Sequence, residues 1–373
     1  MNSLPRYACN ATLIGLCLTA ANIAFAQVST INSANYHPRE FNDVPGSTLT
    51  VVSNFPSLVA FDDQNVSAPT GFANRHVWRF SKDSGVTPYR FGNDEFFSAS
   101  MTVTLTGDPI SPRKEAGFLL STIGGEGQFI VNTDGHEVVA FGGPFPFYAF
   151  PGTFNSGDTI KLGITYFLKS NGKRAIIYSA NCLQSPPLEF SNLEQGIIDN
   201  STLGAYFQIV NSPLNSTNSG TVVYENINIG ATDLDGDGVA DALDACPNTP
   251  PCSIVDAQGC SIDQLAPCAG PASGGVWKNH GQYTAAVARA AGEFLAQGLI
   301  TQSEQDAIVT AAAQSPCGSK SRCSALRGPS CKTQGYGLMS NDRHRFRFER
   351  GRWRLLLRAL SSTAWNFHRA FDV

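Results

Sequence analysis

Residues 97–106 alternate between apolar and small polar side chains. The apolar residues from Phe97 to Leu105 fall on every second position, and Ser or Thr occupies each position between them. Successive side chains of a strand point to opposite faces, so this pattern puts all the apolar groups on one face. It predicts an antiparallel strand with one face in a core and the other in water.

Similar short apolar segments follow at intervals marked by turn residues. We expect further strands at residues 117–122, 128–132, 137–141, 159–168, 173–179, 201–210 and 222–229. Asp134-Gly135 and Asn171-Gly172 separate two pairs of these segments and predict hairpin turns. Many short strands with no convincing helix among them predict a mainly β fold, an antiparallel jelly-roll β-sandwich over residues 27–230.

The pattern becomes helical after residue 275. In residues 283–295, Tyr283, Val287, Ala291 and Phe294 fall at helical spacing. A second helix is expected from the capping box that starts at Thr301 to about residue 313, with Gly298 in the turn between the helices. Residues 270–319 are therefore predicted to form a small helical hairpin, which needs a staple to be stable at this length.

The N-terminal segment predicts export. A short basic region, an apolar stretch at 11–20 and the residues Ala24-Phe25-Ala26 have the three-part form of a signal peptide over residues 1–26. No membrane span is expected after its removal. Ten cysteines occur in the chain, and the eight outside this segment are expected to form disulfides in an oxidising compartment.

The cysteine pairing stays open from spacing alone. We favour Cys246 with Cys260 and Cys268 with Cys317, the second pair closing the two ends of the helical hairpin. Zinc is the competing interpretation, but these cysteines are accompanied by no Cys-x-x-Cys and no His pair.

Residues 233–244 carry the most specific chemical signal. Asp233, Asp235, Asp237, Asp241 and Asp244 occupy positions one, three, five, nine and twelve of this stretch, with Gly238 at position six. Ca²⁺ takes six to eight oxygen ligands, and this is the ligand spacing of a twelve-residue calcium loop. The carbonyl of Val239 is a further expected ligand. Asp244 is shorter than the bidentate Glu of an EF-hand, which favours weak binding with a Kd of about 10⁻⁴–10⁻³ M.

This motif runs directly into Cys246-Pro247 and follows a β-like segment, so it lacks the flanking helices of an EF-hand. The stretch from Asp233 to Cys260 resembles the thrombospondin type 3 repeat in the form used by bacterial surface proteins. The resemblance implies a calcium-binding extracellular spacer or adhesion element over residues 231–269. Residues 277–281, Trp-Lys-Asn-His-Gly, resemble a helical tail found after the same module in exported bacterial proteins. Within it we interpret His280 as part of a local structural turn.

A second, less specific resemblance concerns the sandwich. Segments such as 115–120, 129–135, 162–167 and 203–208 are similar in rhythm to the concanavalin A-like lectin and glucanase jelly roll. This resemblance implies carbohydrate binding. Glucanases of that class place paired carboxylates on one strand, a spacing that this chain lacks. We interpret Asp94, Glu95, Asp134, Glu137 and Glu115 as surface acids, with Glu115 in a solvated charge cluster.

Aromatic rings stack on the faces of sugars, so exposed rings are the expected recognition groups of such a module. The candidate carbohydrate-binding residues are Phe145, Phe147 and Tyr148, in an aromatic stretch between Gly-rich segments, and Trp78. Packing of these rings against a loop and the edge of the core is the alternative interpretation.

The C-terminal segment differs in charge from the rest of the chain. Residues 320–373 hold ten Arg and two Lys against three acidic residues, whereas residues 27–319 hold thirteen basic and twenty-seven acidic residues. A basic arm for an anionic partner and out-of-frame translation of GC-rich DNA are both open interpretations. We favour a disordered or artefactual tail and expect no nucleic-acid partner.

Three functions follow from these observations. The first is a secreted bacterial calcium-binding protein of the cell surface or extracellular space, with a non-catalytic carbohydrate-binding sandwich and a polysaccharide or cell-surface glycan as partner. The second is an extracellular glycan-degrading enzyme whose acids meet only in the fold. The third is a purely structural surface protein whose only ligand is calcium.

Overall fold

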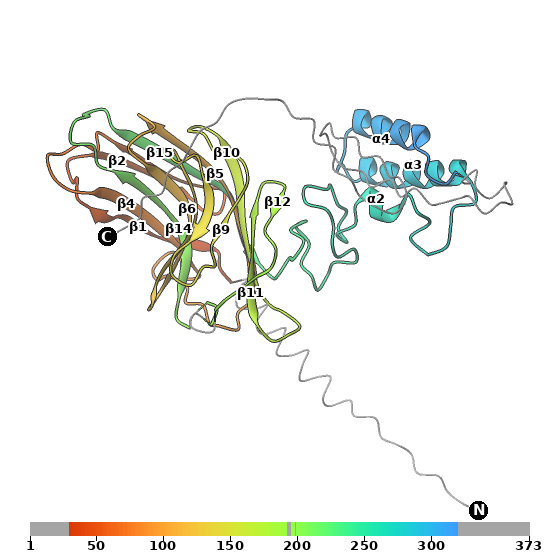
Figure 1. Cartoon of the computed structure of the whole chain (residues 1–373), viewed down its shortest axis with the longest axis horizontal. Helices are drawn as coiled ribbons and strands as arrows, with labels where there is room; N and C mark the ends of the chain where they lie inside the picture. The colour runs from red at the N-terminus through yellow and green to blue at the C-terminus, as the bar shows by residue number, and fades with distance from the viewer. Residues whose placement is uncertain (1–29, 192–194, 198, 320–373) are drawn as a thin grey trace, which may run out of the picture. The chain divides into compact units, whose positions relative to one another are not determined.

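The computed structural model describes residues 30–191, 195–197 and 199–319. The predicted signal peptide (1–26) and basic tail (320–373) lie outside the described residues. Within them, the larger part of the chain is a sandwich of two antiparallel sheets that pack face to face (Figure 1).

The first sheet has seven strands. Their order is β1 (Ser33–Asn42), β4 (Ala73–Ser81), β14 (Thr202–Val210), β6 (Lys114–Thr122), β7 (Gly125–Asn132), β8 (Val138–Phe141) and β9 (Tyr148–Ala149). The second sheet has eight strands. Their order is β12 (Leu183–Gln184), β11 (Arg174–Ala180), β10 (Thr159–Leu168), β5 (Phe97–Asp108), β15 (Ser219–Gly230), β3 (Leu58–Gln64) and β2 (Thr48–Asn54), with β13 (Leu188–Glu189) paired to β11.

The chain crosses repeatedly between the two sheets, as in a jelly roll, and the core lies between them. Strand β5 shows the predicted alternation directly, because Phe97, Met101 and Leu105 are buried while the hydroxyl residues between them face outward. Inward residues of the opposite sheet, such as Phe118 and Phe207, complete one large apolar cluster. The predicted sandwich and its antiparallel strands are confirmed.

The expected strand positions agree with β5–β8, β10, β11, β14 and β15, and the two predicted turns join β7 to β8 and β10 to β11. Sequence patterning gave no positions for β1–β4. Strand β2 is exposed along nearly its whole length at a sheet edge, and β1 is an edge strand with a bulge between His37 and Phe41. Edge strands bury little side-chain surface, so they show little of the period-two pattern used to recognise strands.

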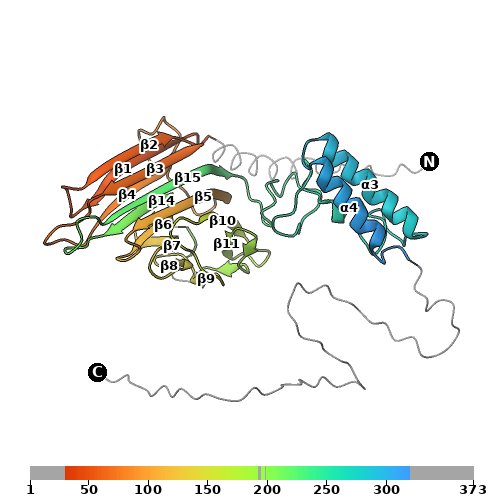
Figure 2. The same cartoon turned by 90° about the horizontal axis from the view of Figure 1, so that it is seen from above.

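The segment after β15 contains turns, an isolated bridge and the short helix α2 (Ile262–Leu265). Helices α3 (His280–Ala296) and α4 (Gln302–Gln314) follow and lie side by side (Figure 2). Thr301 caps α4 with the predicted capping box, since its side chain and that of Glu304 each accept from the other residue's backbone N–H. Disulfide Cys268–Cys317 staples this hairpin as expected. In the part of the chain that the structure covers, no helix has the length and apolar character needed to span a membrane.

Candidate functional site

The aspartate loop begins on the outer surface of the eight-stranded sheet. The backbone N–H of Asp233 donates to Oγ of Ser98 (2.9 Å), and its carbonyl accepts from Oγ1 of Thr165 (3.1 Å). Ser98 and Thr165 face each other across β5 and β10, and their hydroxyls are 2.8 Å apart. The sheet therefore fixes the backbone of the first predicted calcium ligand.

Two glycines let the loop fold back on that residue. The backbone N–H groups of Gly236 and Gly238 donate to the two carboxylate oxygens of Asp233, at 2.8 and 2.9 Å. Both glycines have positive φ, 76° and 100°, which a residue with a Cβ adopts only at a cost. Gly238, at position six of the predicted calcium loop, thus forms a sharp turn. The N–H of Val239 holds Oδ1 of Asp237 (2.8 Å), while its carbonyl remains a predicted ligand.

Three carboxylates converge in the folded loop. One oxygen from each of Asp233, Asp235 and Asp237 lies within 4.8 Å of the other two. The Oδ2 atom of Asp237 is buried and has no hydrogen-bond partner among the described residues. A buried carboxylate oxygen without a donor is costly, and a bound cation would satisfy it.

The pKa shifts of these carboxyl groups also favour a bound cation. Burial, followed by the negative charges of Asp237 and Asp235, raises the pKa of Asp233 to about 6. Burial is also the main cause that raises the pKa of Asp237, to which the charge of Asp235 adds. Hard oxygen ligands of like charge held together match the preference of Ca²⁺, so the residues present fit this ion.

The last two predicted ligands have different surroundings. Asp241 is exposed, and its Oδ1 accepts from the N–H of Leu234 at 2.8 Å, which ties the two ends of the loop together. Oδ1 of Asp244 accepts from the N–H of Cys246 at 2.7 Å. Asp244 nevertheless lies beside the cluster, because a Cβ built on Gly259 would overlap Oδ1 of Asp244 and come within 3.0 Å of Oδ2 of Asp237.

Disulfides and hydrogen bonds clamp the loop from both sides. Cys246–Cys260 forms as predicted and closes the segment that carries Gly259. The N–H of Thr249 donates to Oδ2 of Asp235 at 2.7 Å. A third disulfide, Cys182–Cys252, joins the end of β11 to the same segment across 70 residues. Sequence spacing gave no indication of that pairing, because the two cysteines meet only through the tertiary fold.

His280 has a structural place at the start of α3. Its Nδ1 lies 2.7 Å from the carbonyl oxygen of Cys317 and its Nε2 lies 3.0 Å from that of Ala313. These two acceptors raise the pKa of the imidazole, because only the protonated ring can donate to both. The ring therefore links the beginning of α3 to the end of α4, in agreement with the predicted structural role.

The aromatic candidates for sugar binding divide into two groups. Trp78 and Phe145 are buried in the sandwich core, so their predicted role in stacking on a sugar is wrong. Phe147 is 71% exposed, and Tyr148 is half-buried against the core in β9. From residue 147 to 150 the side chains alternate, with Phe147 and Ala149 exposed and Tyr148 and Phe150 toward the core, so only part of the stretch is available to a ligand.

The acids of the sandwich are held by intramolecular partners. Arg113 pairs with Asp134 at 2.8 Å and lies 3.7 Å from both Glu115 and Glu137. Glu115 is buried instead of solvated as predicted, and it accepts from the hydroxyl of Tyr206 at 3.0 Å. Burial raises the pKa of its carboxyl group. The fold thus gathers three acids around one guanidinium on the outer face of the seven-stranded sheet.

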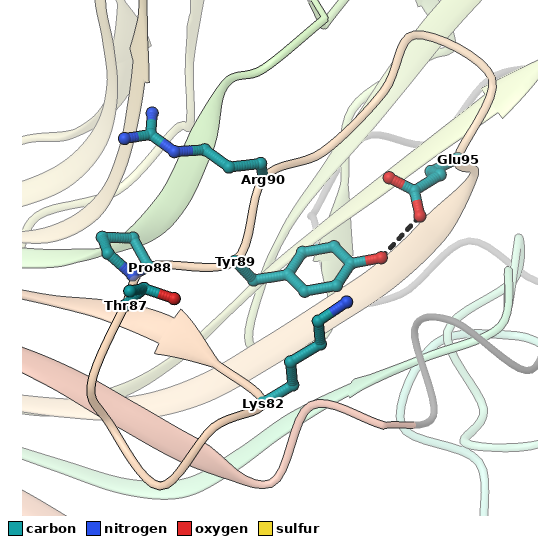
Figure 3. Close-up of a pocket in the computed structure, with 6 residues that line it drawn as sticks. All are labelled: Lys82, Thr87, Pro88, Tyr89, Arg90 and Glu95. Carbon is teal, nitrogen blue, oxygen red and sulfur yellow. Dashed lines mark hydrogen bonds between the residues drawn. The ribbon is translucent and has the colours of Figure 1, made fainter.

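A pocket of about 290 Å³ lies in the loop between β4 and β5 (Figure 3). Glu95 is fixed there, since it accepts from the hydroxyl of Tyr89 (2.6 Å) and the N–H of Gly92 (2.7 Å). The ammonium of Lys82 lies over the Tyr89 ring, 5.2 Å from its centroid, while Arg90 points away from both Lys82 and Glu95 (Figure 3). The charged groups do not converge on one point, so this pocket offers no obvious reaction centre.

No family model matches the chain, and no curated protein matches it in sequence. Similar solved structures include an alginate lyase of polysaccharide lyase family 7, with 10% identity over 57% of this chain and 99% of that one and a TM-score of 0.37. An alginate lyase from Corynebacterium sp. has 13% identity, covers 54% of this chain and 95% of its own, and has a TM-score of 0.36. A functionally unknown protein from Saccharomyces cerevisiae has 15% identity, with coverages of 52% and 100% and a TM-score of 0.30. Similarity of this size assigns no activity to the chain.

Proposed function

We propose that this chain is an exported bacterial protein of the cell surface or extracellular space, in which a bound calcium ion fixes a non-catalytic, carbohydrate-binding β-sandwich to a helical module. The observation that carries the proposal is the convergence of Asp233, Asp235 and Asp237 beside the unpartnered buried oxygen of Asp237.

The role of the ion is structural in this proposal. Asp233, Asp235 and Asp237 would hold it, with Asp244 and the Val239 carbonyl as further ligands, and the ion would supply the positive charge that the clustered acids lack. The same loop is hydrogen-bonded to Ser98 of the sheet on one side and to Thr249 on the other, and the carbonyl of Cys246, just after the loop, accepts from Gln264 of α2. Calcium would therefore stiffen the connection between the two parts.

Three disulfides support a location outside the cytoplasm. They link Cys182 with Cys252, Cys246 with Cys260 and Cys268 with Cys317. Such bonds form and persist in oxidising compartments, in keeping with the predicted signal peptide. The thrombospondin type 3 assignment of residues 231–269 belongs to the same proposal and predicts the calcium dependence tested below.

The surroundings of the acids favour binding over catalysis. In the described sandwich, Arg113 lies beside the acids around Glu115, and each carboxylate oxygen of Glu95 accepts a hydrogen bond. A glycan-degrading enzyme instead needs one carboxyl group free to donate or accept a proton at the substrate. The exposed ring of Phe147 remains the sandwich's candidate for stacking on a sugar.

Calorimetric titration of the full chain with Ca²⁺ tests the metal proposal. We expect saturable binding that is lost when Asp235→Asn and Asp237→Asn are combined, and kept in the matched control Asp263→Asn, an exposed acid of α2 outside the loop. Equal calcium binding by the double variant and the control would contradict the ligand assignment.

A glycan array and a reducing-sugar release assay on the same protein separate the three functions. Retention of a glycan without release of sugar is expected. Release of sugar would favour the enzyme, and the absence of both signals would leave a purely structural surface protein.

A further inference from the structure

A second pocket, of about 230 Å³, lies between the calcium loop and the outer face of the eight-stranded sheet. Its floor belongs to strands β5, β10, β11 and β15, and its roof includes Asp233, Gly236 and Gly238 of the loop. The pocket therefore exists only because the loop is held against the sheet through Ser98 and Thr165.

The floor is hollow because of one glycine. Asn228, Ser100, Gly163 and Ser179 are neighbours in one row across the four strands. Gly163 leaves the centre of this row without a side chain, and a Cβ placed there would overlap Oγ of Ser179. The φ of Gly163 lies outside the left-handed region, so the missing side chain is not required by the backbone.

The polar groups around this hollow are free. The side chains of Ser100, Ser179, Asn228 and Lys161 make no hydrogen bond or ion pair with the rest of the described chain, although all four line the pocket. They offer two hydroxyls, one amide and one ammonium to a bound molecule. Elsewhere on the same sheet the outward hydroxyls bond to each other, as Thr104 and Thr159 do at 2.7 Å.

We propose that this pocket binds one uronic acid residue of a glycan, with Ser100, Ser179 and Asn228 on the sugar hydroxyls and Lys161 on the carboxylate. The hydroxyl and amide set matches a polyhydroxylated ring, and the unpaired ammonium selects the acidic form of that ring. A volume below the roughly 300 Å³ typical of pockets for drug-sized ligands suits a single sugar unit.

The site rests on the proposed function, since the calcium loop forms its roof. No aromatic ring is among the described residues that line it, so recognition depends on hydrogen bonds that compete with water, and we expect affinity in the millimolar range. An acidic glycan that presents several uronic acid residues to surface-attached copies of the protein would bind with higher overall avidity than a single residue.

Ligand-observed NMR on the full, calcium-loaded chain tests the site with D-glucuronate and D-glucose as probes. We expect tighter binding of glucuronate than of glucose. Lys161→Ala should weaken glucuronate binding about tenfold, the effect of losing one charge-assisted hydrogen bond, and should leave glucose unaffected. Gly163→Ala should abolish binding of both sugars by filling the hollow, while Ser179 rotates away from the new methyl group.

Thr106→Ala, on the same face of β5 but outside the pocket, is the matched control and should bind like the unmodified protein. Unfolding curves of each variant establish that it is folded. Glucuronate binding unchanged in both pocket variants would overturn the proposal, and so would equal binding of the two sugars. If the chain binds calcium but neither sugar, the pocket assignment fails alone; if it binds no calcium, the proposed function fails independently of the sugar result.

Discussion

Gly259→Ala tests the calcium site without removing any of its carboxylates. Gly259 has φ of 78°, and a Cβ at this position would overlap Asp244 and crowd Oδ2 of Asp237. The left-handed backbone costs an Ala residue about 1–2 kcal/mol whatever its neighbours. Gly172→Ala is the matched control, because Gly172 has φ of 77° and nothing within 4 Å of its ideal Cβ. Without calcium both variants should lose the stability that the left-handed backbone costs, and Gly259→Ala should lose somewhat more because it displaces Asp244. Only Gly259→Ala should respond more weakly to calcium.

The size of that response follows from the expected affinity. With a Kd of about 10⁻⁴–10⁻³ M, 5 mM Ca²⁺ stabilises the folded chain by about 1–2 kcal/mol. For a chain of this size, this raises the Tm by about 2–8 °C. Displacing two acidic ligands should weaken binding at least about tenfold, which would reduce the calcium-dependent Tm rise to half or less. Thermal unfolding in the presence of calcium and in the presence of EDTA measures this rise in Tm. An equal rise in Tm for Gly259→Ala and Gly172→Ala would refute the placement of Asp237 and Asp244 at the ion.

Three further predictions concern the rest of the fold. The raised pKa of Glu115 means that the charged form of its carboxyl group is disfavoured in the folded state. The stability of the folded chain should therefore fall as the pH rises from the ordinary pKa of Glu through the raised pKa of Glu115. Glu115→Gln should flatten this dependence in thermal unfolding between pH 4 and 8. His280 has a raised pKa, so its contribution to folding stability should be complete below about pH 6.5 and disappear as the pH rises through its pKa in the folded state. The melting temperatures of the unmodified chain and of His280→Gln should therefore converge above that pKa. Replacing Cys182 and Cys252 together by Ser should cost about 4 kcal/mol in chemical unfolding, from the entropy of a 70-residue closed loop, whereas an unchanged midpoint would mean that the unfolded chain is not constrained there.

The pattern of apolar and polar residues predicted those elements that have one clearly buried face and one clearly exposed face. Strand β5 shows this best, since every second residue from Phe97 to Leu105 is buried. Strands β1 and β2 were not predicted, because they lie at sheet edges and bury little side-chain surface. Helix α4 could be located to its first residue, because the capping box at Thr301 is a local interaction with a fixed spacing.

The same distinction between local and tertiary information applies to the functional groups. The predicted ligands Asp233, Asp235 and Asp237 and the glycine Gly238 lie within six residues, so the sequence spacing alone predicts this part of the site. The burial of Trp78 could not be predicted, because β4 is buried on both faces and therefore lacks the alternation of apolar and polar residues that identifies a core-facing side chain. Glu115 has a basic residue on its N-terminal side in sequence, yet the partner that buries it, Tyr206, is 91 residues away.

Asp233 connects these two levels of organisation. Its carboxylate accepts from the two loop glycines within the predicted calcium motif, while its backbone N–H and carbonyl are bonded to the sheet hydroxyls of Ser98 and Thr165. A cation that draws the three carboxylates together would therefore also fix where the loop sits on the sheet, and with it the roof of the pocket above Gly163. Suppose that calcium raises the affinity of the pocket for a sugar by holding this roof in place. Thermodynamic linkage then requires the bound sugar to raise the affinity of the loop for calcium by the same factor. Calcium titrations in the presence and absence of glucuronate should consequently differ, and the glucuronate titration should show the same factor in calcium.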